Sequence, residues 1–317
     1  MSPLFSLLSP AGPRARLSVL IFHRVLPEPD PIFPGEIDVP RFDAICRWVR
    51  QWFNVLPLDV AVGRLQQGTL PARAAAITFD DGYADNHDHA LPLLQRHGLP
   101  ATFFIASGFI DGGCMWNDGV IDAVRRCRTP QLEVAGLADL PDERLAVDSV
   151  TAKRAAIARI IGAVKYLPVA QRLEIVATLR RRAGVDDRPG WMMSTEQLRA
   201  MRRAGMQIGA HTVTHPILAR LDRAAALDEM RRGRDFLESA LQERVGLFAY
   251  PNGRPGTDYS EENVAVAREA GFDAAFTTAW GAASVNTDPF QLPRFTPWDQ
   301  GRARFGLRLA GNLWTSR

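Results

Sequence analysis

Residues 74–81 read Ala-Ala-Ala-Ile-Thr-Phe-Asp-Asp. The first six are apolar or β-branched without alternation, which is typical of a parallel strand buried on both faces. The two carboxylates that follow, Asp80 and Asp81, are costly at the end of such a strand unless they are paired, hydrogen-bonded or bound to a cation. A helix cap beside a surface charge is the plainer interpretation of this pair. The stretch predicts a buried strand that ends in functional carboxylates.

A second segment repeats this arrangement far downstream. Met206–Ala210 is a short apolar run that leads directly into His211, and His215 follows four residues later. Imidazoles at this spacing can face one point, although two helix-face histidines would look the same. Two His and one Asp leave coordination positions open, as in a catalytic metal site. Because both segments stand at predicted strand ends, we interpret them together as a divalent-metal site with one carboxylate left for chemistry.

The motifs T-F-D-D-G-Y (78–83) and H-T-x-x-H (211–215) resemble the first two motifs of the polysaccharide deacetylases, the NodB-homology carbohydrate esterases. The resemblance covers roughly residues 17 to 300. It implies a distorted (β/α) barrel that removes N-acetyl, and sometimes O-acetyl, groups from sugars with the help of a metal. By this resemblance Asp80 is the general base, while Asp81, His211 and His215 hold one divalent ion. Zinc is expected, and cobalt, nickel, manganese or iron would suit the same ligands.

The chain departs from the family's third motif, an Arg-x-Pro-Tyr-type segment whose Arg braces the base. Ala249 stands at the Arg position, ahead of Tyr250-Pro251-Asn252. A Pro-Asn-Gly turn could still present the Asn252 N–H to an oxyanion. We therefore expect Tyr250, Pro251 and Asn252 to form the substrate and oxyanion side of the site. Arg294, which follows a late predicted strand, is the candidate brace, with a surface salt bridge as the alternative.

The general acid also needs a new source, because no histidine follows His215. His23 directly follows the apolar run 19–22, and its F-H-R-V segment resembles an early Tyr-His-x-Val motif of the poly-N-acetylglucosamine deacetylase branch. We predict that His23 protonates the leaving amine. A buried structural histidine is the alternative.

Apolar strand-like runs alternate with helix-like stretches along the chain, which predicts an α/β fold in one catalytic domain spanning residues 1–317. Residues 128–190 interrupt this alternation with polar, helix-rich sequence, and we interpret them as a helical insertion with no core strand. Trp116, in a loop ahead of the insertion, is a candidate for stacking on a sugar ring. A core tryptophan that fastens the insertion is the alternative.

Composition sets the remaining expectations. At 317 residues and 46% hydrophobic, the chain can bury a full core, and it has no apolar run of the ~18 residues that a membrane span needs. Its net charge of +3, with arginines interleaved among acids, argues against a nucleic-acid partner. Three cysteines and no recognisable signal peptide favour a cytoplasmic location. The oligomeric state is not predicted.

The sequence thus predicts a hydrolase acting on an N-acetylated amino sugar or polysaccharide. The motifs specify the metal and the base rather than the pocket, so a formamide, a cyclic amide or an O-acetyl ester could be the substrate of the same site. A non-catalytic, glycan-binding relative is a further alternative. A metal-independent barrel with paired carboxylates would leave His211 and His215 unexplained.

Overall fold

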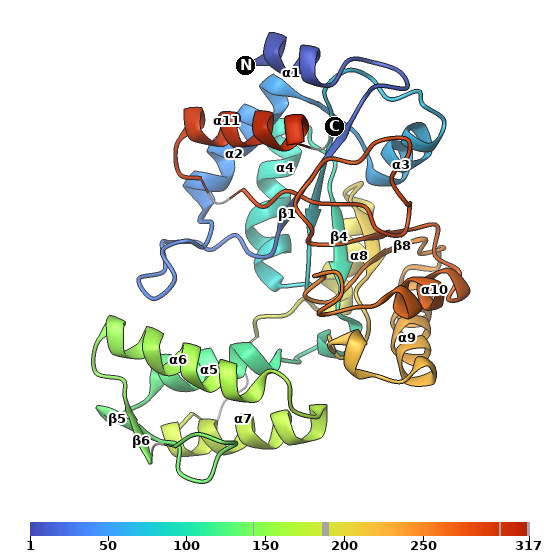
Figure 1. Cartoon of the computed structure of the whole chain (residues 1–317). Coiled ribbons are helices and arrows are strands. Elements are labelled where there is room, and N and C mark those ends of the chain that lie inside the picture. The colour runs from blue at the N-terminus through green and yellow to red at the C-terminus, as the bar shows by residue number, and fades with distance from the viewer. Residues whose placement is uncertain (142, 186–189, 298, 316–317) are drawn as a thin grey trace. The chain divides into compact units, whose positions relative to one another are not determined.

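The computed structural model describes residues 1–141, 143–185, 190–297 and 299–315 (Figure 1). Within these residues the main sheet has seven strands, all parallel, in the order β1-β3-β4-β7-β8-β9, with β2 paired to the beginning of β3. The strands are β1 (Leu17–Phe22), β2 (Asn54–Val55), β3 (Ala74–Phe79), β4 (Thr102–Ile105), β7 (Gln207–Ala210), β8 (Leu247–Ala249) and β9 (Ala274–Phe276).

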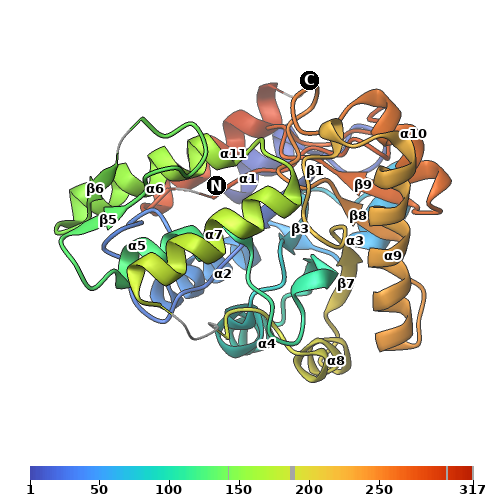
Figure 2. The same ribbon diagram turned by 90° about the horizontal axis from the view of Figure 1, so that it is seen from below.

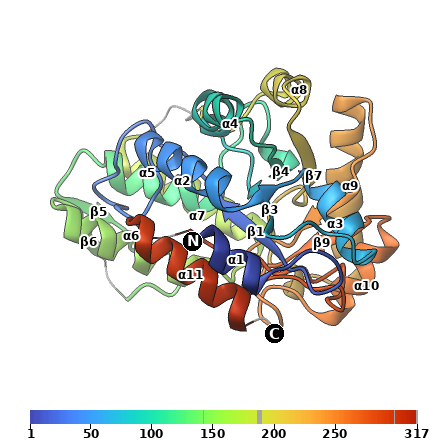
Figure 3. The same cartoon turned by 90° about the horizontal axis from the view of Figure 1, so that it is seen from above.

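Helices connect and cover these strands. They are α1 (Ser2–Leu8), α2 (Val39–Trp52), α3 (Leu58–Gln66), α4 (Leu91–His97), α8 (Thr195–Arg203), α9 (Arg223–Leu241), α10 (Glu261–Glu269) and α11 (Arg302–Thr315). Three single-turn elements are the π-helix η1 (Asn86–Ala90) and the 3₁₀-helices η2 (Ser107–Phe109) and η3 (Leu218–Arg220). Seen from below and from above, α4, α8 and α9 follow one another around the outside of the strands (Figures 2 and 3).

Alternate strand residues point into two different apolar clusters. In β1, Leu17 and Val19 lie in a cluster formed by strand residues together with α3, whereas Leu20 and Phe22 lie in the larger cluster formed with the other helices of the barrel. This division is the period-two alternation of a strand that is buried on both faces. It accounts for the uninterrupted burial of all six residues of β1 and of all six of β3.

A segment without regular structure, Leu292–Phe295, closes the curled sheet between its two edge strands, and we call it the closing segment. On the β1 side, the Phe295 N–H donates to the Val19 carbonyl at 2.7 Å and the Ile21 N–H donates to the Phe295 carbonyl at 3.0 Å. On the β9 side, the Thr277 N–H donates to the Leu292 carbonyl at 2.9 Å. The predicted distorted (β/α) barrel is therefore confirmed.

The chain divides into two compact units. The first holds the barrel, and the second comprises Pro29–Pro34 and Gly112–Trp191. The second unit contains α5 (Trp116–Arg126), α6 (Val150–Val164), α7 (Val169–Ala183) and the short antiparallel strands β5 (Gln131–Glu133) and β6 (Arg144–Ala146). It has its own apolar cluster, to which α5, α6 and α7 all contribute.

The predicted insertion, residues 128–190, falls within this second unit, which begins earlier because α5 packs into its core. Besides its helices the unit contains two short strands, β5 and β6, which pair along three residues each. Each of these strands buries only its central leucine, so neither carries the apolar run by which a core strand is recognised. The assignment of residues 1–317 to a single catalytic domain stays a prediction. No helix in the described ranges is long and apolar enough to cross a bilayer.

Candidate active site

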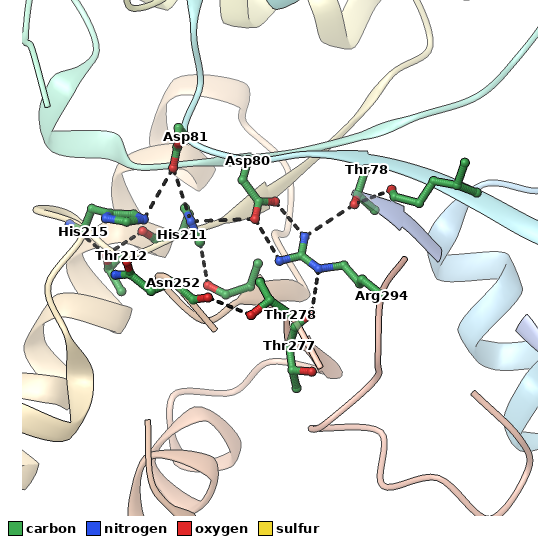
Figure 4. Close-up of polar contacts among 12 residues, drawn as sticks. Thr78, Asp80, Asp81, His211, Thr212, His215, Asn252, Thr277, Thr278 and Arg294 are labelled. Carbon is green, nitrogen blue, oxygen red and sulfur yellow. Dashed lines mark hydrogen bonds and ion pairs between the residues drawn. The ribbon is translucent and has the colours of Figure 1, made fainter. Parts of the chain in front are cut away.

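The predicted site residues come from the carboxyl ends of neighbouring parallel strands. Asp80 and Asp81 follow β3, His211 follows β7, and Tyr250 follows β8. Because parallel strands end at the same edge of a sheet, side chains far apart in sequence meet there. Figure 4 shows the two aspartates, both histidines and Arg294 converging on one point.

Asp80 forms a bidentate ion pair with Arg294. The two terminal guanidinium nitrogens of Arg294 donate to Asp80 Oδ1 at 2.7 Å and to Oδ2 at 2.8 Å. Arg294 Nε donates to the Thr277 carbonyl at 2.9 Å, and Nη1 approaches Thr78 Oγ1 at 3.4 Å. Only 2% of Asp80 and 1% of Arg294 is exposed, so a surface salt bridge does not describe this pair.

The pairing keeps the buried Asp80 carboxylate ionised. Burial raises the pKa of a carboxyl, but the positive charge of Arg294, helped by His211 and by two hydrogen bonds, outweighs it. The net effect is an Asp80 pKa below its usual range. Removing one partner of a buried pair leaves the other charge uncompensated, which typically costs about 3–5 kcal/mol.

Asp81 is held in a conformation that is uncommon for a non-glycine residue. Its φ is +78°, and Gly82 follows with φ +93°. This turn directs the two adjacent carboxylates to different partners, Asp80 to Arg294 and Asp81 to the histidines (Figure 4). Asp81 Oδ1 is buried and accepts no hydrogen bond. A buried carboxylate oxygen without a donor is costly, and a cation would satisfy it.

The spacing of the three ligand atoms fits a shared metal ion. Asp81 Oδ1 lies 3.5 Å from His211 Nε2 and 3.4 Å from His215 Nε2. All three groups offer ligand atoms within 4.8 Å of one another. Ligand atoms about 2.0–2.2 Å from a tetrahedral zinc ion lie roughly 3.3–3.6 Å apart. Asp81, His211 and His215 could therefore hold one divalent ion, and their oxygen and imidazole donors suit zinc, cobalt, nickel, manganese or iron.

A backbone carbonyl orients the first histidine. His211 is 1% exposed, and its Nδ1 lies 2.7 Å from the Ala249 carbonyl. With the proton on Nδ1, the Nε2 lone pair faces Asp81, which is the tautomer that a metal ligand requires. Ala249, which stands where the family's third motif carries an Arg, thus contributes its carbonyl to the site.

The two imidazoles differ in their electrostatic environment. Burial disfavours the protonated form of both imidazoles and so lowers the pKa of each. At His211 the neighbouring carboxylates Asp81 and Asp80 outweigh burial, so the pKa is raised. At His215 burial dominates, the proximity of His211 adds to it, and the pKa falls to about 4. His215 is therefore neutral near pH 7, as metal coordination requires.

The Tyr250-Pro251-Asn252 turn contributes backbone rather than side chains. Tyr250 is fully buried, its hydroxyl donates to the Phe290 carbonyl at 3.0 Å, and its ring stacks on Tyr259. Asn252 is exposed with φ +57°, and its carbonyl accepts from Thr278 Oγ1 at 2.8 Å. Among the described residues, none accepts a hydrogen bond from the Asn252 N–H. That group is free to meet a developing negative charge.

His23 lies just beyond β1 with an exposed side chain, which excludes a buried structural histidine. Its positive charge would contribute to lowering the pKa of both Asp80 and Asp81. Two residues that follow the aspartate pair in sequence hydrogen-bond the backbone of the His23–Val25 segment. Asn86 Nδ2 donates to the His23 carbonyl at 2.9 Å, and Asp85 accepts from the Val25 N–H at 3.1 Å.

Trp116 begins α5 in the second unit and is 8% exposed. It packs in the apolar cluster of that unit, and the Arg172 guanidinium lies 5.2 Å from its ring centre. This burial matches the alternative of a core tryptophan, and sugar stacking by Trp116 stays a prediction.

Several contributors to the site carried no recognisable pattern. Asp85 and Asn86 belong to a polar run after the first motif that looks like a solvated helical face, yet they are 8% and 0% exposed. Thr78 lies within the first motif, where its hydroxyl bridges the Leu20 carbonyl and Arg294. Glu229, on α9, hydrogen-bonds the loop between the two histidines. Such contacts connect residues distant in sequence, so a linear pattern could not reveal them.

Known proteins resemble this chain in sequence and in fold. The model of the polysaccharide deacetylase family matches residues 67–135 and 163–275, so the chain belongs to this family. The protein named "Putative polysaccharide deacetylase YxkH", from Bacillus subtilis (strain 168), is 21% identical over 284 residues, which cover 88% of this chain and 71% of that protein.

Two solved structures are similar in fold. The Streptococcus pyogenes deacetylase PplD in complex with acetate has a TM-score of 0.60 at 18% identity, covering 89% of this chain and 92% of that one. IcaB from Ammonifex degensii has a TM-score of 0.58 at 20% identity, covering 94% and 98%. These likenesses extend over both chains almost completely.

The buried Asp80–Arg294 pair should make the stability of the protein depend on pH. In metal-free protein, Arg294→Leu should lower the free energy of unfolding by about 3–5 kcal/mol near neutral pH. Because the folded-state pKa of Asp80 lies below its unfolded value, of about 3.9, ionised Asp80 stabilises the wild type above that pH. Without Arg294, burial should raise the Asp80 pKa, so the variant's deficit should shrink as the carboxyl protonates on acidification.

Urea denaturation of both proteins between pH 7 and pH 4 measures this deficit. The exposed pair Arg232–Asp228, an i,i+4 pair on α9, provides the control. Arg232→Leu should cost less than about 1 kcal/mol. A deficit for Arg294→Leu that does not change with pH would contradict the electrostatic explanation.

Proposed function

We propose that this chain is a metal-dependent deacetylase that removes N-acetyl groups from an amino sugar within a polysaccharide or its precursor. The proposal depends on one observation, that the two adjacent carboxylates have different partners. Asp80 is ionised by Arg294 and stands 4.0 Å from His211 Nε2, while Asp81 faces both histidines. One carboxylate is thus placed to hold a metal and the other is left to move a proton.

Asp81, His211 and His215 would hold the metal ion. When bound, a divalent ion there polarises an acetyl carbonyl and lowers the pKa of a water molecule. The protein's contribution is to favour neutral His215 and to fix the orientation of the His211 ring. His215 has a pKa of about 4, and the Ala249 carbonyl keeps the His211 proton on Nδ1.

Asp80 would act as the general base. Its carboxylate accepts the proton of the attacking water as the water oxygen bonds to the acetyl carbon. The bidentate contact with Arg294 keeps Asp80 ionised at neutral pH and fixes the orientation of its oxygens. Arg294 acts through Asp80 in this scheme and serves as a positioning residue.

Negative charge that develops on the acetyl oxygen needs a donor, and the leaving amine needs a proton. The Asn252 N–H would donate to the oxygen, because it stands at the end of β8 without a partner among the described residues. His23 would protonate the amine nitrogen as the carbon–nitrogen bond breaks. The acid product ionises to acetate and leaves with the free amino sugar, Asp80 passes its proton to solvent, and His23 regains one from solvent.

Hydrolysis of an O-acetyl ester would place the same demands on the metal and on Asp80. It would depend less on a general acid, because an alkoxide is a better leaving group than an unprotonated amide nitrogen. The acid at His23 therefore separates amide from ester substrates. The cytoplasmic location and the choice of zinc stay predictions.

The metal site and the activity can be tested together. Elemental analysis of the purified wild type should find about one divalent ion per chain, and His211→Ala should lack it. The metal-loaded wild type should release acetate from N-acetylglucosamine oligomers, and chelation should abolish this release reversibly. Equal, substoichiometric metal in both proteins would contradict the ligand assignment, and metal without acetate release would point to another substrate.

The base is tested by Asp80→Asn. This variant should keep its metal and lose about 10²–10⁴-fold in turnover, the usual scale for general acid–base catalysis. Asp88→Asn, on η1, is a matched control, because Asp88 is half exposed and pairs with His87 away from the ligands. Rates of acetate release at saturating substrate measure the difference. Retention of most activity by Asp80→Asn would exclude it as the base.

The acid is tested by His23→Ala. An amide must lose a poor leaving group, so its hydrolysis should slow far more than that of an activated aryl acetate, whose leaving group needs little protonation. The ratio of amide to ester rates in the same preparation measures the effect without depending on the folded fraction.

His87→Ala is the control for His23→Ala, because His87 belongs to η1 and hydrogen-bonds Asp88. An unchanged amide-to-ester ratio in His23→Ala would assign the acid to another group and leave the roles of Asp80 and the metal ligands untouched.

A further inference from the structure

The loop that connects the two histidine ligands has a strained backbone. Thr212 has φ +66° and His215 has φ +52°, both in the left-handed region that non-glycine residues rarely adopt. Such conformations cost conformational free energy and persist only where surrounding contacts impose them. His215 can face Asp81 only because the chain turns in this way.

One side chain, Glu229 on α9, supplies contacts that impose this turn. Its Oε2 accepts hydrogen bonds from the Val213 N–H and the Thr214 N–H, each at 2.9 Å, and its Oε1 accepts from Thr214 Oγ1 at 2.7 Å. A carboxylate that accepts two successive backbone N–H groups fixes both peptide planes at once. These planes lie between the strained Thr212 and the ligand His215.

Helix α9 approaches the loop closely at a second position, one turn beyond Glu229. There, Gly233 lies so near that a Cβ at its position would approach the Thr212 carbonyl carbon and oxygen to 2.9 Å. From the other side, η2 donates the Ser107 and Gly108 N–H groups to the Thr212 and Val213 carbonyls at 3.1 Å and 2.9 Å. The Thr212 and Val213 carbonyls thus have partners on η2, and the Val213 and Thr214 N–H groups have theirs on Glu229. The His215 N–H donates within the loop, to Thr212 Oγ1 at 3.1 Å.

We infer that Glu229 is a positioning residue that preorganises the metal site by holding the His211–His215 loop in its binding conformation before the metal arrives. The inference rests on the proposed function only in taking His211 and His215 as ligands. Without the Glu229 carboxylate, the loop can relax from its left-handed conformation and carry His215 away from Asp81. Metal binding must then restore this conformation, and affinity falls by that cost.

Titration of metal-free protein with Co²⁺ alone, followed by its visible absorption, tests the role of Glu229. Glu229→Ala should bind Co²⁺ about 10–100-fold more weakly, the usual cost of losing a group that orients metal ligands. Glu229→Gln should lie between this variant and the wild type, because an amide oxygen still accepts both N–H groups and the amide nitrogen can donate to Thr214. This graded rescue is not expected from a general loss of packing.

Glu238→Ala is the matched control. Glu238 also lies on α9 and accepts a backbone N–H, that of Val245 at 2.9 Å, but it does not touch the histidine loop. It should bind Co²⁺ as the wild type does. If Glu238→Ala weakens binding as much as Glu229→Ala, the effect is general to α9 and the inference is overturned.

Asp81→Ala separates the failure of this inference from that of the proposed function. Loss of Co²⁺ binding in Asp81→Ala, with wild-type affinity in Glu229→Ala, would overturn the role of Glu229 and leave the metal site intact. Unchanged affinity in both would overturn the ligand assignment itself. Should Glu229→Ala not fold, Glu229→Gln decides, and wild-type affinity in that folded variant counts against the inference.

Discussion

The burial of the Asp80 carboxylate against Arg294 is the interaction on which the rest of the site depends. A lone carboxylate at this depth would be protonated or would destabilise the barrel, so Asp80 needs a cation that is equally buried. Arg294 belongs to the closing segment, which hydrogen-bonds to both edge strands, β1 and β9. The contacts that complete the barrel therefore also bring the Arg294 guanidinium to Asp80, and architecture and electrostatics are coupled through one short stretch of chain.

Backbone groups account for much of the remaining geometry. The Ala249 carbonyl sets the tautomer of His211, and the left-handed conformations of Asp81 and Thr212 direct the ligands toward one another. Glu229, an acidic side chain on an outer helix, holds the histidine loop through its N–H groups. Substitutions that leave every motif residue in place could thus still impair the site.

The departure at Ala249 has a structural explanation. Where the family's third motif places an Arg to brace the base, this chain has a small buried residue whose carbonyl contacts His211, and the cation for Asp80 comes from Arg294 instead. The Arg294 guanidinium reaches the Asp80 carboxylate from the closing segment rather than from the end of β8. The requirement for a buried cation is met, although the segment that supplies it has changed.

The strand β3, the aspartate pair and the two histidines could be predicted because each depends on local pattern, an uninterrupted apolar run followed at once by ligand-type residues. The early boundary of the second unit and the β5–β6 pair could not, because α5 looks like any amphipathic helix and each short strand buries a single leucine.

The chain's linear order was sufficient for the α/β class and for which residues lie at strand ends, since burial and periodicity depend on consecutive positions. The barrel was expected only from the resemblance of the two motifs to a known family. The linear order left open which cation pairs with Asp80, whether the Tyr250 ring faces solvent or core, and what holds the histidine loop. Folding settled those questions, because the partners Arg294, Phe290 and Glu229 are brought to the site by packing between elements that no local pattern connects.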